Sequence, residues 1–515
     1  MPTFKHTHLY VRWIFLRLLS LSFLFAFLSI ATQMLGLYGQ HGILPIRNFL
    51  AVVSERLGPD AIINFPSIFW MNSSDGFMQV VCSTGIMASL LALAGICTGI
   101  SLTICWFLYL SIVCVGQTFM AFQWDSLLLE TTLLGIWFSP FCWQEIQPFN
   151  RKQFEAQKEV SLVFLFLLRF LCFKLMLFSG ICKLSSQDPA WHDLTAMTYH
   201  YETQPLPPPL AWFMQKLPVW YQKFSTLMVF VLELVMPISL LTFWRPARIV
   251  AAIGFIGLML LIMVTGNYAF FNLLTIALSF TLLDDQALLA LLPRFAQGKP
   301  IKQSPRIGVT ISNSLWTLIP GIVIGICSFS FFWLMVDRTT GKETLPAIAK
   351  VPILLSSPLR SFNSYGLFAI MTTKRPEIIV EGSNDGENWI EYEFKFKPGD
   401  IKRAPPIVAP HQPRLDWQFW FASLGGTVDQ SPWFDSYAKH LLEGTPEVLG
   451  LMGKNPFSEA PPKQVRAVYY DYHFSDWDGL FKRGEWWRRE KTGEFYPATS
   501  LEELQGAPKP ADISY

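Results

Sequence analysis

The sequence predicts a multipass α-helical membrane bundle followed by a soluble, mainly β domain with helical insertions. The 515-residue chain is 51% hydrophobic and 15% charged, whereas soluble domains carry about 25% charged residues. Charge is also unevenly distributed. Residues 1–339 hold 20 Lys/Arg and 15 Asp/Glu, and residues 340–515 hold 20 and 23. We therefore expect a transmembrane domain over 1–339 and a soluble β-rich domain over 340–515.

Long apolar runs fill the first region, and a helix needs about 20 apolar residues to cross a bilayer. Nine segments approach this length: 13–37, 77–97, 100–121, 126–143, 160–184, 223–243, 247–266, 270–292 and 315–336. The fourth segment is short and contains Glu130. Asp284 and Asp285 interrupt the eighth, so that its last part is alternatively an interfacial helix.

The distribution of Lys and Arg predicts the orientation of this bundle. With nine spans and a cytoplasmic N-terminus, eleven cations of the connecting segments lie on the cytoplasmic side and five on the opposite side, as the positive-inside rule requires. The segments 38–76 and 185–222 and the C-terminal domain then share the non-cytoplasmic side.

Five charged side chains are expected at membrane depth, where a charge costs roughly 2.5–3.5 kcal/mol on insertion scales. They are Arg17, Glu130, Arg169, Lys174 and Glu233. Arg169 and Lys174 lie five residues apart, which is about 140° around a helix, so they do not share a narrow face. Two interpretations remain open. The charges form salt bridges between helices, or they line a polar cavity for a lipid headgroup, a proton or a reacting group.

The segment 185–222 is rich in aromatic residues and proline. Its candidates for contact with a partner are Trp191, His192, Tyr199, His200, Tyr201, Glu202 and Trp212. Tryptophan and tyrosine at the ends of spans often form an interfacial belt, and the alternative is a docking surface for another protein. The spacing of the histidines and carboxylates matches no common metal-ligand pattern, so we expect no metal here.

Alternating residues predict strands in the C-terminal domain. In WIEYEFKFK (389–397), apolar and charged residues alternate as in a half-buried strand. RPEIIVEG before SNDGENW predicts a strand followed by a turn at Asp385-Gly386. VRAVYYDYHF (465–474) and EWWRRE (485–490) predict further strands, and the segments between are amphipathic helices. An antiparallel sandwich with helical insertions fits these patterns. The domain has no cysteine, which excludes a disulfide scaffold.

Several classes of function find no support in the residues. The net charge is +2 without a basic stripe, so we expect no nucleic-acid partner. No phosphate-binding loop, dinucleotide fingerprint or nucleophile elbow is present, and we expect no cofactor.

Five long motifs carry a resemblance to a known family. They are QWDSLLLETTLLGIWFSP (123–140), LMLFSGICKL (175–184), LTAMTYHYETQPLPPPLAW (194–212), TGNYAFFNLLTIALSFTLLDDQ (265–286) and the segment 380–425 beginning VEGSNDGENW. In this order they resemble the lipase maturation factor family, over almost the whole chain. The resemblance implies a multipass membrane protein that helps secreted lipases fold and assemble, with client contact in the region that corresponds here to about 340–495. It also implies the endoplasmic reticulum membrane in a eukaryotic host or the inner membrane in a bacterial one, with the C-terminal domain lumenal or periplasmic. It offers no catalytic residues.

Two functions from different classes follow. The first is a membrane-bound maturation factor whose exported segments hold a secreted client, a lipase by resemblance. The alternative is a membrane enzyme acting on a lipid or lipid-linked group, since the charged bundle is loosely similar to that of vitamin K-dependent carboxylases; Lys174 or Glu130 would then be the acid or base. A transporter is less well supported, because no inverted repeat stands out.

Overall fold

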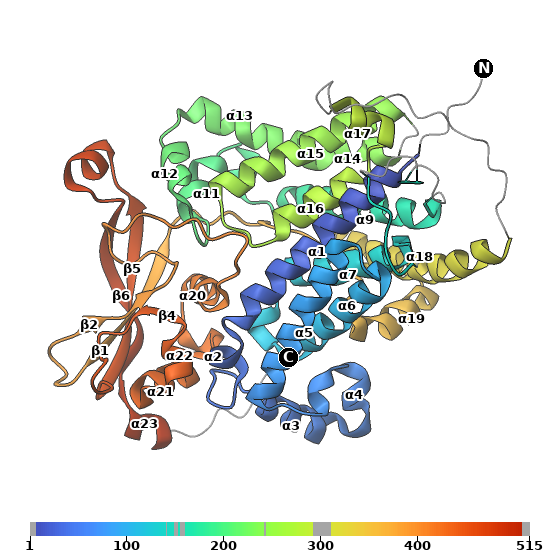
Figure 1. The fold of residues 1–515 in the computed structure, drawn as a ribbon. Helices are drawn as coiled ribbons and strands as arrows, with labels where there is room; N and C mark the ends of the chain where they lie inside the picture. The colour runs from blue at the N-terminus through green and yellow to red at the C-terminus, as the bar shows by residue number, and fades with distance from the viewer. Residues whose placement is uncertain are drawn as a thin grey trace.

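The computed structural model describes residues 7–140, 142–148, 153–154, 160–241, 244–291 and 311–506. A bundle of helices forms one part, and a sheet with short helices forms the other (Figure 1). Helices α20 (Arg414–Gly425), α21 (Phe434–Glu443) and α22 (Pro446–Leu449) lie between the sheet and the bundle. Apolar side chains form one continuous core across both parts, as the Trp124–Trp417 ring contact at 4.9 Å illustrates.

Seven helices among the described residues are long and apolar enough to cross a membrane. In chain order they are α1 (Leu9–Ala31), α5 (Asp75–Ala94), α6 (Thr98–Val115), α9 (Leu162–Ser185), the stretch Val219–Ile238, α15 (Arg245–Thr265) and the part Thr317–Thr340 of α18 (Ile311–Thr340). The stretch Val219–Ile238 joins α13 (Val219–Phe230), the π-helical turn η4 (Val231–Val235) and α14 (Met236–Ile238). These seven helices establish an integral membrane protein.

Two of the nine predicted spans are wrong in length. The segment 126–143 forms α7 (Gln123–Phe138), which ends because Ser139 is extended before Pro140. The segment 270–292 breaks into α16 (Phe271–Phe280) and α17 (Asp285–Leu291). Asp284 causes this break, because its carboxylate accepts the Ala287 N–H at 2.8 Å and so caps α17.

Two of these short helices, α7 and α17, begin at opposite ends of the bundle. At the amino end, where α1 begins, Asp285 accepts the Leu9 N–H at 2.7 Å, and the Glu145 N–H donates to Gly95 at 2.8 Å. At the domain end, where α1 stops, Gln123 donates to Gly366 at 2.9 Å. Helix α7 therefore begins at the domain end of the bundle, and α17 begins at the amino end.

The segments predicted to share one side of the membrane do lie together at the domain end. After α1 come α2 (Met34–Tyr38), α3 (Ile46–Leu57), η1 (Gly58–Asp60), α4 (Ala61–Asn64) and η2 (Ile68–Trp70); η3 (Gln117–Met120) precedes α7. The segment 185–222 folds into α10 (Pro189–His192), α11 (Met197–Thr203) and α12 (Pro209–Gln215). His440 of α21 contacts the Gly42 carbonyl at 3.1 Å, and Arg375 donates to the Glu202 carbonyl at 2.6 Å.

The C-terminal region contains the expected strands and helices. Strands β1 (Pro376–Ser383), β2 (Ile390–Glu391), β5 (Gln464–Phe474) and β6 (Trp487–Ser500) form an antiparallel sheet in the order β2-β1-β5-β6. Strands β3 (Glu393–Phe394) and β4 (Met452–Lys454) form a second, two-stranded sheet. Among its described residues, the C-terminal region also contains five shorter helical elements: α19 (Ala347–Ser356), η7 (Ser357–Leu359), η8 (Val428–Gln430), η9 (Gly479–Arg483) and α23 (Leu501–Gly506).

One predicted strand is divided and one predicted turn is confirmed. WIEYEFKFK splits into β2 and β3, because the Tyr392 N–H bonds to Val380 at 2.8 Å while the next residues pair with β4 instead. The turn at Asp385-Gly386 is present. Gly386 has a φ of 78°, which glycine adopts without strain, and the Asp385 carboxylate accepts the Asn388 N–H at 2.8 Å.

Candidate functional site: the junction between bundle and C-terminal domain

Arg414, the first residue of α20, reaches into the membrane bundle. Its two terminal nitrogens donate to the two carboxylate oxygens of Asp125 in α7, each at 2.9 Å, and one of them also donates to the Phe119 carbonyl at 2.7 Å. Tyr109 of α6 donates its hydroxyl to the same carboxylate. The Arg414 and Asp125 side chains are 1% and 0% exposed. This forked, buried pair fixes the orientation of α20 on the bundle.

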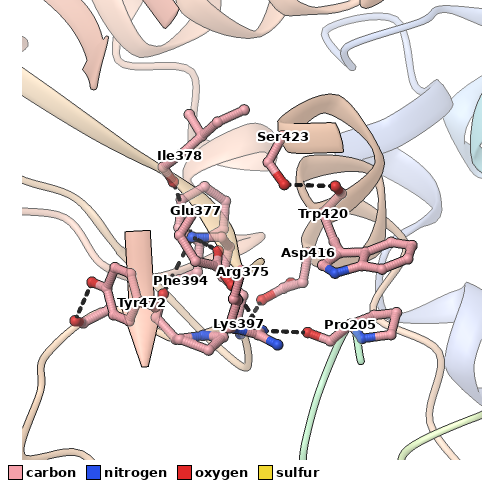
Figure 2. A network of polar contacts seen from close by, with 12 residues as sticks. Pro205, Arg375, Glu377, Ile378, Phe394, Lys397, Asp416, Trp420, Ser423 and Tyr472 are labelled. Atoms are coloured by element: carbon pink, nitrogen blue, oxygen red, sulfur yellow. Dashed lines mark hydrogen bonds and ion pairs between the residues drawn. The ribbon is translucent and has the colours of Figure 1, made fainter. Parts of the chain in front are cut away.

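A second buried network holds the segment 202–205 against the sheet (Figure 2). Arg375 donates to the carbonyls of Glu202 at 2.6 Å and Pro205 at 2.9 Å, and also to that of Gln204. Its guanidinium is ion-paired with Glu377 of β1 at 2.8 Å. The five N–H donors of an arginine fork suit such a set of carbonyls. One arginine side chain of the domain therefore binds three backbone carbonyl groups of this segment.

Lys397 and Asp416 complete this network on the domain side. Lys397 lies 3.0 Å from Glu377 and donates to the Ile378 carbonyl at 2.9 Å, and Asp416 accepts the N–H groups of Phe396 and Lys397 at 3.0 and 2.8 Å. Burial lowers the pKa of Lys397, and the Glu377 carboxylate opposes that shift. Burial likewise raises the pKa of Asp416, opposed by its backbone donors. Figure 2 shows these side chains converging between the sheet and α20.

Glu130 and Lys174 form a third buried pair, inside the bundle. The Lys174 amine donates to one Glu130 oxygen at 2.5 Å. The other oxygen accepts the Tyr365 hydroxyl at 2.5 Å and the Asn363 N–H at 3.1 Å. Both charged side chains are at most 2% exposed. The pair thus joins α7 and α9 to the segment that leads into the C-terminal domain, and this geometry favours the salt-bridge interpretation.

The other three charges predicted at membrane depth also have polar partners. Arg17 pairs with Glu145 at 2.6 Å. Glu233 pairs with Lys183 at 2.7 Å. Arg169 donates to the Thr281 carbonyl at 2.8 Å. Arg169 and Lys174 thus have different partners, since Thr281 lies in the turn after α16 and Glu130 lies in α7.

The structure divides the seven candidates of the segment 185–222. Trp191, Tyr201 and Trp212 are buried, which corrects their prediction as exposed contact residues. The Trp191 indole donates to Phe368 at 2.9 Å, and the Trp212 indole donates to Ser475 at 3.3 Å. These aromatic rings pack against the C-terminal region of the same chain.

Of the remaining four candidates, two are engaged and two face outward. Glu202 contacts His473 at 2.9 Å and accepts the Phe474 N–H at 2.8 Å. His200 is half-buried against the Phe368 ring at 5.4 Å, and burial, with the charge of Lys183, lowers its pKa to about 4. His192 and Tyr199 are exposed.

Reasoning from the sequence missed the residues of the domain that make the junction. Nothing in the sequence indicates that these charged residues are buried, since charged residues in a soluble domain are normally exposed. They are Arg375, Glu377, Lys397 and Arg414. Asp125 and Arg414 do lie within two of the five long motifs, but their separation of 289 positions gives no sign that they pair.

A groove of about 660 Å³ opens on the C-terminal domain beside β2 and β6. Its lining combines acidic, basic and apolar side chains, among them Glu393, Asp400, Lys454, Arg488, Ile390 and Trp487. Ile390 is half exposed there. A groove of mixed character beside strand edges suits an extended polypeptide segment.

Comparison with known proteins finds relatives of both parts of the chain. A model of the lipase maturation factor transmembrane domain matches residues 10–290, and a model of the lipase maturation factor C-terminal domain matches residues 361–497. Lipase maturation factor 2 of Gallus gallus is 34% identical over 95% of this chain and 81% of its own length. The Homo sapiens protein of that name is also 34% identical, over 95% and 82%.

Lipase maturation factor 1 of Mus musculus is 32% identical over 98% of this chain and 90% of its own length. No solved structure is a significant match. Because both family models match in order and the relatives align over nearly the full chain, the chain belongs to the lipase maturation factor family.

Proposed function

We propose that this chain is a membrane-bound maturation factor that holds a secreted lipase while the lipase folds or assembles. The observation that carries the proposal is the junction itself. Buried ion pairs and backbone contacts fasten the C-terminal domain and the segment 185–222 into one unit at the domain end of the bundle. Such a unit offers a client a preorganised surface close to the membrane, which lowers the entropy cost of binding.

The domain end faces the exported side of the membrane in this proposal. The Lys/Arg bias of the connecting segments supports that orientation. In a eukaryotic host this side is the lumen of the endoplasmic reticulum. Reporter fusions at residues 210 and 400 check the orientation, and the proposal requires that both report a non-cytoplasmic position.

The client surface consists of the groove beside β2 and the exposed residues of the segment 185–222. Tyr199 and Ile390 represent these two places and are both exposed. The polar network around Glu130 and Lys174 then serves to brace the bundle, since the Glu130 oxygens and the Lys174 amine already have partners within the chain. Membrane lipid surrounds the bundle and is its second partner.

Site-specific photocrosslinking tests the proposal. A photoreactive amino acid is placed at Tyr199 or Ile390 in the full chain and co-expressed with a secreted lipase, with exposed Glu502 of α23 as the control position. We expect lipase adducts from Tyr199 and Ile390 and none from Glu502. Absence of lipase adducts from both test positions, with normal amounts of the full chain, rejects the proposed client surface.

A further inference from the structure

The turn between β5 and β6 carries two exposed aromatic rings. Trp477 and Phe481 are 52% and 69% exposed and stack on one another with their centroids 5.7 Å apart and their planes 3° apart. The turn is ordered. Asp476 accepts the Gly479 N–H at 2.6 Å, and Gly484, with a φ of 69°, ends the turn in the left-handed region. Large exposed aromatic rings on an ordered turn indicate a contact surface.

This turn packs directly on the segment that enters the membrane. The Trp477 ring lies 4.9 Å from that of Trp212 and 6.3 Å from that of Phe213, both in α12. Only residues 216–218 connect α12 to α13, and three residues reach at most about 11 Å. The aromatic turn is therefore held close to the level at which the span Val219–Ile238 begins.

The surface around the turn continues into the lipid-facing side of that span. Phe213 is exposed beside Trp477, and Trp220 in the first turn of α13 is 70% exposed. Phe224 and Leu227 follow on α13 and are exposed as well. Few residues of this span are covered by the rest of the described chain, so its exposed apolar side chains face lipid. The aromatic turn thus extends a surface that is already in contact with the membrane.

The charges of the turn are compatible with the headgroup layer. Lys482 lies 3.1 Å from Asp478, and Arg483 lies 2.8 Å from Glu485, so the acidic groups are balanced by neighbours. Lys216 lies over the Trp212 ring at 5.1 Å. Aromatic rings accompanied by Lys and Arg are characteristic of the membrane–water interface, where the rings sit at headgroup level.

We infer that the β5–β6 turn inserts Trp477 and Phe481 into the headgroup layer of the membrane and anchors the C-terminal domain to the lipid surface. The anchor is a second attachment besides the buried junction. It lies at the far end of the sheet from α23, because β5 has 11 residues and rises about 3.3 Å per residue. The domain is then fixed at its base by Arg414 and at the turn by lipid.

Depth-dependent fluorescence quenching tests the anchor. The full chain with Cys142→Ser, which removes an exposed thiol, receives Lys482→Cys, is labelled with bimane and is reconstituted into phosphatidylcholine vesicles with or without doxyl-labelled phosphatidylcholine. Lys482 directly follows Phe481 in the chain and is exposed, so labelling leaves both rings intact. Lys463→Cys is the matched control, since Lys463 is exposed at the opposite end of β5.

We expect loss of fluorescence at position 482 and none at position 463 when the doxyl lipid is present. The additional changes Trp477→Ser and Phe481→Ser are expected to abolish quenching at 482, while a cooperative thermal unfolding transition shows that the chain is still folded. An unquenched label at 482 overturns the inference, and so does quenching that persists without the two rings. A label at 482 that responds to added lipase and not to doxyl lipid identifies the turn as a protein contact instead, which also overturns it.

Discussion

Arg414 and Asp125 lie 289 positions apart in the chain and form a forked ion pair whose two contacts are both 2.9 Å long. Asp125 belongs to helix α7 of the bundle and Arg414 to α20 of the C-terminal domain. Both side chains are buried, so the pair is protected from screening by salt. This contact is therefore one of those that fix how the domain sits on the bundle.

Replacing Arg414 by Met is expected to destabilise the junction by about 3–5 kcal/mol, because it leaves the buried Asp125 carboxylate without its charged partner. Thermal unfolding of the purified chain in detergent measures the effect. Arg414→Met combined with Asp125→Leu is expected to lose less than the sum of the single changes. The control is Lys439→Met in the exposed Lys439–Glu443 pair, with a loss below about 1 kcal/mol. Equal effects of the Arg414 and Lys439 changes would contradict this assignment.

Replacing Arg375 by Lys is expected to loosen the segment 202–205, since an ammonium group cannot supply the fork that reaches three carbonyls. Loss of hydrogen bonds to a charged group costs roughly 1.5–3 kcal/mol each. Hydrogen exchange in α11, which ends at Thr203, should become faster. The matched control is Arg488→Lys, an exposed arginine of the same domain. Unchanged exchange in α11 after Arg375→Lys shows that the segment is held by other contacts.

Lys174→Met is expected to lower the yield of folded, monodisperse protein, because Glu130 keeps only neutral partners at a buried position. The double change Lys174→Met and Glu130→Gln is expected to recover part of that yield. The alternative interpretation as a reacting site predicts another result. If the pair is a reacting site, the Lys174→Met chain accumulates normally and loses all activity. That outcome would contradict the structural role assigned to the pair.

Acid is expected to weaken the contact between α1 and the C-terminal domain. Burial, with the charges of Arg414 and Lys395, lowers the pKa of His411 to about 4 from an ordinary 6.5. In the unfolded chain this histidine therefore binds a proton below about pH 6.5. In the folded chain it becomes protonated only near pH 4. Its stability contribution is complete above pH 6.5 and declines as the pH falls toward 4, and His200 acts in the same direction.

The variant His411→Asn checks this pH dependence. His411 contacts the Ser29 hydroxyl of α1 at 3.0 Å, and asparagine retains a polar group without titrating in this range. We expect the unfolding temperature of the variant to fall less than that of the parent chain between about pH 7 and pH 5. A parallel fall in both proteins would assign the acid sensitivity to other groups.

The sequence was sufficient for the seven long helices and for the strands that became β1 and β5, because hydrophobic length and alternation are local signals. The premature end of α7 and the break before α17 depend on one proline and one capping aspartate, which hydropathy averages do not register. The sequence therefore shows that these two segments are short or interrupted, but not where their helices end.

The candidate site was predicted only in part. The sequence indicates Glu130 and Lys174 as candidates, because they are charged residues within apolar segments. It does not indicate that they pair with each other across 44 positions. Trp212 was expected to be exposed because its partner, Ser475, lies 263 positions later. Contacts at such separation leave no pattern in a single sequence, so burial of an aromatic residue by a distant domain is found only in three dimensions.

The most direct test of the account is lipase maturation by the full chain in cells that lack their own lipase maturation factors. A secreted lipase is expressed with this chain or with an empty vector, and the ratio of lipase activity to lipase mass in the medium is measured. The account predicts a higher ratio with the full chain, unchanged lipase synthesis, and a reduced gain with Arg414→Met. The same ratio with and without the chain, while the chain is folded and in the membrane, would contradict it.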